Sequence, residues 1–245
     1  MLKRIIVIAL VIVCIFSLTA CGSNTSNTSN GEASQNQVAT GYMKTPCRKD
    51  SVDEFIDIIG EVELGGLYSG MKLEKEHCYN VTPESVSAQT DYKIFKFSDS
   101  CVSLLLIDNE IYSICESFGG FGFINAVPWD YDENGTLDLL VASSWGSGLH
   151  RSIISVFDTT TKESITIFDT SDTDNPSIDL FVATSSPSAT MPEGIDTPIY
   201  YEVYSARIEV TNEDYNLADL SYVATDIIGA VIVENGKPVF KPTSK

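Results

Sequence analysis

The chain has few of the residues that most catalytic sites need. Among 245 residues it contains only two histidines, His77 and His150, so a zinc site built from several histidines is excluded. It contains no Gly-x-Ser-x-Gly nucleophile motif, no phosphate-binding glycine-rich loop with lysine and no dinucleotide-binding fingerprint. A carboxylate pair for glycoside hydrolysis stays open, but nothing singles out two of the 34 acidic residues. We therefore expect a protein that is not an enzyme.

Basic residues are also scarce. The chain has 15 Lys and Arg residues against 34 Asp and Glu residues, a formal net charge of −19. Loss of Lys3 and Arg4 with an N-terminal signal would lower the basic count from 15 to 13 and make the net charge about −21. Such a surface repels nucleic acid and anionic lipid headgroups, so we expect no nucleic-acid partner. Solubility outside the cell is the simplest reason for the acidity.

The N-terminus reads as an export signal. Lys3 and Arg4 precede an unbroken apolar run of 12 residues, Ile5 to Phe16, which is short for a membrane-spanning helix and typical of a secretory signal. The sequence Leu18-Thr19-Ala20-Cys21 that follows resembles the bacterial lipobox. The resemblance implies that residues 1–20 are a lipoprotein signal peptide and that Cys21 is lipidated. It places the protein at the outer face of the cell membrane, attached through its lipid anchor.

The rest of the chain divides by composition. Residues 21–48 are predicted to be the lipidated cysteine and a disordered polar tether, because a repeated Ser-Asn-Thr pattern cannot bury enough apolar surface. Residues 49–90 are predicted to be a small helical and irregular segment, in which Ser51 to Glu54 has the spacing of a capping box and the helix ends at Gly60. Residues 91–245 are predicted to form an antiparallel β domain.

Alternating apolar residues predict most of that domain's strands. The predicted strands cover residues 92–97, a hairpin within 101–116, 123–127, 137–143, 152–157, 164–168, 199–210, 227–233 and, after an Asn235-Gly236 turn, 238–240. The predicted fold class is mainly β (α+β), an antiparallel sheet with one short N-terminal helix.

One internal similarity suggests an alternative, a propeller-like repeat. The segments that begin at Asp138, Asp179 and Asp219 share an Asp-Leu start and a Val-Ala-Ser/Thr end, at spacings of 41 and 40 residues. The acidic pair before the first copy is missing from the others, so chance similarity among β-rich segments explains the pattern better.

Export makes disulfide bonds possible for the cysteines beyond the lipobox. Those cysteines are Cys47, Cys78, Cys101 and Cys115. A two-residue turn at Asp108-Asn109 would place Cys115 opposite Val102, whereas a three-residue turn would place it opposite Cys101. The sequence leaves the disulfide pattern open.

The strongest motif is the acidic loop that begins after Trp129. Oxygen-bearing residues fall at loop positions 1, 3, 5 and 9, and Gly135 stands at position 6, where it permits a sharp reversal. A Ca²⁺ ion takes 6–8 oxygen ligands from such loops. The predicted ligands are Asp130, Asp132, Asn134, the backbone carbonyl of Thr136, and Asp138. Position 12 is Val141 rather than the Glu of a helix-flanked loop, so the loop should lead directly into a strand.

The pattern Asp-x-Asp-x-Asn-Gly-x-x-Asp-Leu before a strand resembles the calcium loops of FG-GAP and VCBS-type repeats. The likeness covers about 40 residues, 120–160, and only one well-formed copy is present. It implies a Ca²⁺ ion that fixes a β-turn, and a structural role is expected because the ligands can fill the shell without substrate. A metal-free acidic turn at Asn134-Gly135 is the alternative.

A second candidate surface follows the strand that leaves the loop. Trp145, His150 and Arg151 border a glycine-rich stretch and could hold an anionic or sugar ligand, although an inter-strand loop with an amphipathic rim explains them more simply. Taken with the acidic loop and residues 118–123, this segment also resembles uncharacterised exported proteins of Gram-positive bacteria, a likeness that implies no activity.

Together these features predict a surface-anchored lipoprotein that binds an extracellular protein or glycan, with a structural Ca²⁺ loop. A secreted hydrolase of cell-wall or glycan material and a purely structural surface subunit are the competing hypotheses.

Overall fold

The computed structural model describes residues 42–60, 73–115, 119–185, 200–210 and 215–243. The predicted signal peptide and Cys21 lie outside these ranges. Within them, no helix has both the length and the apolar character that crossing a bilayer requires.

Strands dominate the described chain and form three antiparallel sheets, so the mainly β prediction is confirmed. The N-terminal sheet has the order β2 (Cys78–Asn80), β3 (Lys93–Phe97), β4 (Ser103–Ile107), β5 (Glu110–Ser113). The middle sheet has the order β6 (Gly122–Trp129), β7 (Asp138–Trp145), β8 (Arg151–Asp158), β9 (Glu163–Asp169). The C-terminal sheet has the order β1 (Tyr42–Lys44), β12 (Leu220–Glu234), β11 (Tyr201–Val210), β10 (Asp179–Thr184), with β13 (Lys237–Pro242) also paired to β12.

Short helices complete the described elements. They are α1 (Val52–Gly60), α2 (Glu84–Ser87) and the 3₁₀ turns η2 (Lys75–His77) and η3 (Thr170–Asp172). The predicted N-terminal helix is confirmed as α1. Ser51, however, has a φ of +60°, which is not the extended conformation of a capping residue.

Strands β6, β7 and β8 of the middle sheet are largely buried on both faces, whereas the edge strand β9 is more exposed. In β7, Leu140 and Ala142 pack against the C-terminal sheet, whereas Leu139 and Val141 pack against the N-terminal sheet. All four side chains are fully buried. Successive residues of a strand point to opposite faces, so a strand covered on both sides reads as a continuous apolar run.

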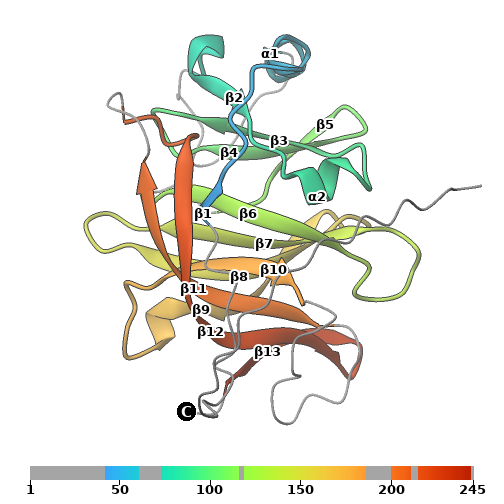
Figure 1. Ribbon diagram of the computed structural model, residues 1–245. Helices are drawn as coiled ribbons and strands as arrows, with labels where there is room; N and C mark the ends of the chain where they lie inside the picture. The colour runs from blue at the N-terminus through green and yellow to red at the C-terminus, as the bar shows by residue number, and fades with distance from the viewer. Residues whose placement is uncertain (1–41, 61–72, 116–118, 186–199, 211–214, 244–245) are drawn as a thin grey trace, which may run out of the picture. The chain divides into compact units, whose positions relative to one another are not determined.

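Helix α1 covers the other face of the N-terminal sheet. The ring of Phe55 in α1 stacks on Phe95 of β3 with 3.9 Å between centroids, and both side chains belong to one buried cluster with residues of β4. The layers therefore follow the order α1, N-terminal sheet, middle sheet and C-terminal sheet, as Figure 1 shows.

The first predicted hairpin has the two-residue turn. Asp108 and Asn109 have φ values of +51° and +64°, and Ile107 pairs with Glu110. The three-residue alternative is therefore wrong, and Cys101, which is a free thiol, does not pair with Cys115. The Asn235-Gly236 turn is also confirmed, because Glu234 pairs with Lys237 across it.

Two predicted domain boundaries are wrong. Residues 42–48 do not belong to a tether, because β1 pairs with β12 and Arg48 bridges to Asn80. The division between residues 90 and 91 also falls inside a sheet, because β2 pairs with β3. Strands β1, β2 and β10 were not predicted; of these, β1 pairs with the distant strand β12, whereas β2 and β10 pair with the next strands in the sequence, β3 and β11.

The three similar segments occupy different places in the fold. Asp138 begins β7, the second strand of its sheet, Asp179 begins the edge strand β10, and Asp219 precedes β12 inside the C-terminal sheet. The segments are not structurally equivalent, so they lend no support to the propeller-like alternative.

Candidate metal centre

The acidic loop connects β6 to β7 in the middle sheet. Trp129 and Asp138 form the last pair of the ladder, which leaves residues 130–137 as the connection. The backbone reverses at Glu133, with a φ of +57°, and at Gly135, with a φ of +85°. Glycine adopts this left-handed conformation without steric cost, which explains its place in the motif.

Backbone amides turn two carboxylates toward the inside of this loop. Asp130 Oδ1 accepts from the N–H of Asn134 at 3.0 Å, and its Oδ2 accepts from the N–H of Gly135 at 2.9 Å. Asp132 Oδ1 also accepts from the N–H of Asn134, at 3.2 Å. The reversal of the chain therefore fixes the direction of both side chains.

Asp138 completes a cluster of three carboxylates. One oxygen each of Asp130, Asp132 and Asp138 lies within 4.8 Å of the others. Oxygens that share one Ca²⁺ at about 2.3–2.6 Å cannot be more than about 5 Å apart, and this cluster meets that limit without rearrangement.

The burial of Asp138 sets it apart from an ordinary acidic turn. Its side chain is 0% exposed, and its Oδ1 accepts from the N–H and the hydroxyl of Thr159 at 2.8 and 3.1 Å. Its Oδ2 is buried and has no hydrogen-bond partner within the described chain. Burial raises the pKa of Asp138, and the carboxylates of Asp158 and Asp132 act in the same direction. A bound cation would satisfy this oxygen and offset the like charges.

Asn134 and Thr136, the two remaining predicted ligands, lie in the same loop, but their placement relative to the three carboxylates is less defined. Asn134 Nδ2 donates to Asp132 Oδ2 at 2.9 Å and to Thr160 Oγ1 at 3.2 Å. Asn134 Oδ1 accepts from the N–H of Thr136 at 2.7 Å and keeps a second lone pair. The structure thus brings Asp130, Asp132 and Asp138 together and holds Asn134 at the edge of the cluster.

The turn between β8 and β9 supports the loop, which the sequence did not predict. Tyr131 donates its hydroxyl to Asp158 Oδ2 at 3.0 Å, while Asp158 Oδ1 accepts from the N–H groups of Thr160 and Thr161 at 2.8 and 2.9 Å. An Asp followed by three threonines is a turn signal that marks this segment. What the sequence does not reveal is that the turn packs against the acidic loop.

The second predicted surface lies at the opposite end of β7. Asp138 begins this eight-residue strand and Trp145 ends it, so the two are about 23 Å apart along the strand. The Arg151 guanidinium lies 5.1 Å from the centroid of the Trp145 ring. His150 instead packs edge-on against Phe121, with 4.8 Å between centroids. Trp145 and Arg151 are thus brought together, His150 has an aromatic partner of its own, and none of the three belongs to the acidic loop.

Comparison of the chain with protein-family models, with curated proteins and with solved structures found no match. The likeness to FG-GAP and VCBS-type loops therefore depends on the residues of the acidic loop alone.

Proposed function

We propose that this protein is an exported, lipid-anchored and non-catalytic binding protein whose β domain is stabilised by one Ca²⁺ ion in the loop 130–138. The observation that carries the metal assignment is the buried, unpartnered Oδ2 of Asp138 within a cluster of three carboxylates. Three negative charges in one loop oppose folding unless a cation balances them.

Ca²⁺ suits this loop better than Mg²⁺. The carboxylates of Asp130, Asp132 and Asp138, with the oxygens of Asn134 and Thr136, supply most of a Ca²⁺ shell from the protein alone. Mg²⁺ requires octahedral geometry at about 2.0–2.1 Å and usually keeps several waters, so an all-protein loop favours the larger ion.

The cation would act as a structural tie. It would join the loop between β6 and β7 to Asp138, which Thr159 already joins to the turn between β8 and β9. Export and anchoring are supported by the signal-like segment 1–20 and by Cys21. Nothing in the described part of the chain selects a carboxylate pair for the hydrolase hypothesis.

Thermal unfolding with Ca²⁺ and with a chelator tests the proposal. At a Ca²⁺ concentration 100 times Kd the stabilisation is about 2.7 kcal/mol, which raises Tm by roughly 5–10 °C for a domain of this size. The Asp132→Ala variant should lose this response, whereas Asp172→Ala, an exposed residue of η3, should keep it. Equal midpoints for the wild type with Ca²⁺ and with chelator would refute the metal assignment.

A further inference from the structure

We propose that a shallow polar groove beside the acidic loop binds a neutral oligosaccharide. This inference rests on the proposed binding function and gives it a site and a class of ligand. Two hollows of about 350 and 410 Å³ lie on the surface and share the segment Thr90–Tyr92 as lining. We call them together the polar groove.

The first hollow lies against the acidic loop. Gly135, Thr136 and Leu137 form one side, and Asp91 and Asp108 lie among the other lining residues. The hydroxyl of Tyr92 donates to the carbonyl of Leu137 at 2.9 Å, so the segment shared by the two hollows is held to the loop. The metal loop therefore forms part of the groove itself.

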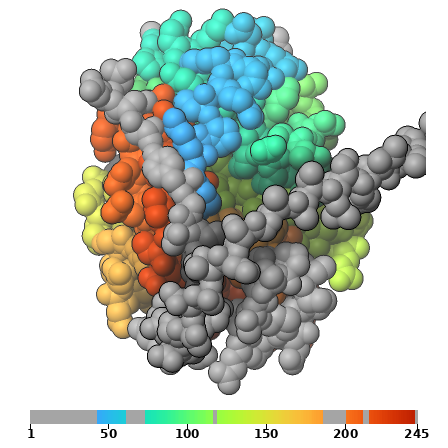
Figure 2. Space-filling view, in the orientation of Figure 1, coloured from blue at the N-terminus to red at the C-terminus, as the bar shows by residue number. Residues whose placement is uncertain are grey.

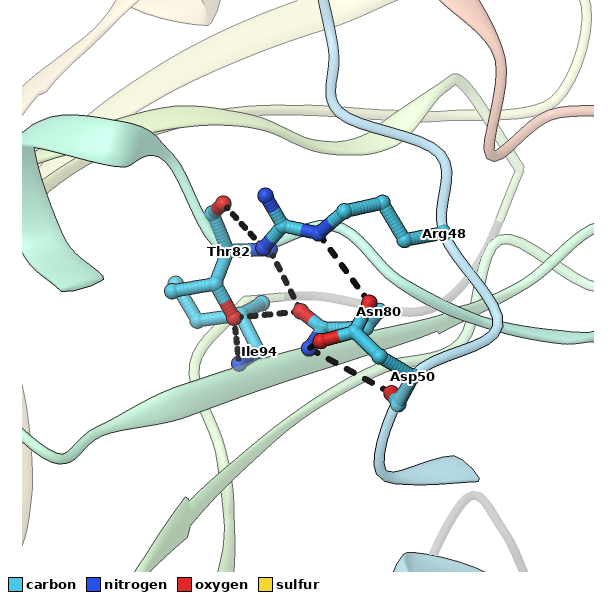
Figure 3. Close-up of polar contacts among 5 residues, drawn as sticks. All are labelled: Arg48, Asp50, Asn80, Thr82 and Ile94. Carbon is cyan, nitrogen blue, oxygen red and sulfur yellow. Dashed lines mark hydrogen bonds and ion pairs between the residues drawn. The ribbon is translucent and has the colours of Figure 1, made fainter. Parts of the chain in front are cut away.

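Four residues that line the second hollow, Arg48, Asp50, Asn80 and Thr82, form a network of polar contacts, which Figure 3 shows. Arg48 Nε lies 3.2 Å from Asp50 Oδ1, and Arg48 Nη2 donates to the carbonyl of Thr82 at 3.1 Å. Asn80 Nδ2 donates to Asp50 Oδ2 at 3.1 Å, and Thr82 Oγ1 donates to Asn80 Oδ1 at 2.6 Å. Arg48 and Asp50 are exposed, and these contacts orient both side chains toward one another and toward Thr82 and Asn80. Side chains that are already oriented lower the entropic cost of binding.

The hydroxyl of Thr82 also accepts from the N–H of Ile94 in β3 at 2.8 Å, which fixes the network to the N-terminal sheet. Residues 42–60, which carry Arg48, lie directly beside α2 on the face shown in Figure 2. The network therefore joins two segments that are far apart in the sequence.

The lining chemistry selects the ligand. Donors such as Arg48 and acceptors such as Asp91 and Asp108 lie in the same groove, and a sugar hydroxyl is both a donor and an acceptor. Across the described residues, the carboxylates of Asp91 and Asp108 have no hydrogen-bond or ion-pair partner, so both are available to a ligand. An anionic ligand would meet these carboxylates and a chain of net charge −19. A purely apolar ligand would leave the polar groups unpaired.

Titration calorimetry with defined probes tests this inference. The probes are neutral tetra- to hexasaccharides of glucose, mannose, galactose and N-acetylglucosamine, with heparin and oligolysine as charged comparisons. The variants are Asp91→Asn and Asp108→Asn, because asparagine keeps the size of the side chain and tolerates the positive φ of residue 108. The matched control is Asp172→Asn in η3.

We expect at least one neutral probe to bind the wild type and the control equally, and both groove variants to bind it at least tenfold more weakly with unchanged Tm. Absence of binding by all four neutral probes up to about 10 mM, preference for a charged probe, or equal binding by the groove variants would overturn the inference. Thermal unfolding with Ca²⁺ and with chelator tests the metal assignment independently of the sugar titrations. A missing Ca²⁺ response with intact sugar binding would refute the metal assignment and leave the groove standing.

Discussion

Thr159 donates two hydrogen bonds to a single oxygen of Asp138. The backbone N–H and the hydroxyl lie 2.8 and 3.1 Å from Oδ1, which leaves Oδ2 as the oxygen with no partner in the described chain. The hydroxyl of Thr159 also lies 3.0 Å from the carbonyl of Leu137. The turn between β8 and β9 thus orients the carboxylate that completes the acidic cluster.

Replacing Thr159 by valine removes the hydroxyl and keeps the backbone N–H. We expect a loss of about 1–3 kcal/mol in the free energy of unfolding, because buried acceptors lose a donor. Ca²⁺ affinity should fall about 10- to 100-fold, as when other outer-shell partners of metal ligands are removed. Urea unfolding and Ca²⁺ titration measure the two effects. Thr166→Val, on the exposed edge strand β9, is the control, and the same affinity in both variants would contradict the assigned role.

The buried Lys96 makes the stability of the fold depend on pH. Its side chain is 0% exposed, and its Nζ donates to the carbonyl of Phe123 at 2.9 Å. Burial lowers the pKa of Lys96 from 10.5 to about 7, against the opposing influence of nearby cysteine side chains. Those cysteines are Cys115, Cys101 and Cys47. Between pH 7 and 10.5 the unfolded chain binds the extra proton, so the contribution of this lysine to stability rises with pH.

The window for this test is pH 7 to 8.5. Over these 1.5 pH units the lysine should add about 1.6 kcal/mol to the free energy of unfolding, because the folded lysine is still half protonated at pH 7. The window stops there because burial raises the pKa of Cys78 from 9.0 to about 12, so this thiol lowers stability as the pH rises past 9. Chemical denaturation of wild type, Lys96→Met and the exposed control Lys237→Met measures the slope. A slope in Lys96→Met that equals the wild-type slope would refute the assignment.

Asn125 closes the free edge of the C-terminal sheet. Its Nδ2 donates to the carbonyl of Val182 at 2.7 Å and its Oδ1 accepts from the N–H of the same residue at 3.1 Å, so the side chain replaces a neighbouring strand. An irregularity in the β6–β7 ladder between Phe123 and Asn125 accompanies this contact. Asn125→Ala should cost about 2–4 kcal/mol, because two buried backbone groups lose their partners. Urea unfolding measures this loss of unfolding free energy, with Asn175→Ala at an exposed site as the control. Equal losses in the two variants would refute the role assigned to Asn125.

The features that the sequence could predict are formed by residues that lie close together in the chain. The Asn235-Gly236 turn forms as predicted, and the turn at Asp108-Asn109 takes the two-residue form, one of the two that the sequence allowed. Both turns require positive φ values, which aspartate, asparagine and glycine tolerate. The acidic loop is likewise local, since only seven residues lie between its first and last carboxylates, and the predicted Asp130, Asp132 and Asp138 converge.

The features that the sequence did not predict depend on contacts between residues that lie far apart in the chain. Val182 lies 57 residues from Asn125, and Thr159 lies 21 residues from Asp138. The predicted tether extended too far because residues 42–44 carry no strand pattern of their own and depend on β12 for pairing. The groove residue Asp50 was missed for the same reason, since Asn80 orients it across 30 positions.

Calorimetric titration of Ca²⁺ into wild type and Asp138→Asn tests the central claim most directly. An amide keeps an acceptor for Thr159 and puts an N–H₂ donor in place of the unpartnered oxygen, so the metal-free variant should be at least as stable as the metal-free wild type. We expect one Ca²⁺ per wild-type chain and at least tenfold weaker binding to the variant. Absence of Ca²⁺ binding to the wild type, or equal affinity in the two proteins, would contradict the account.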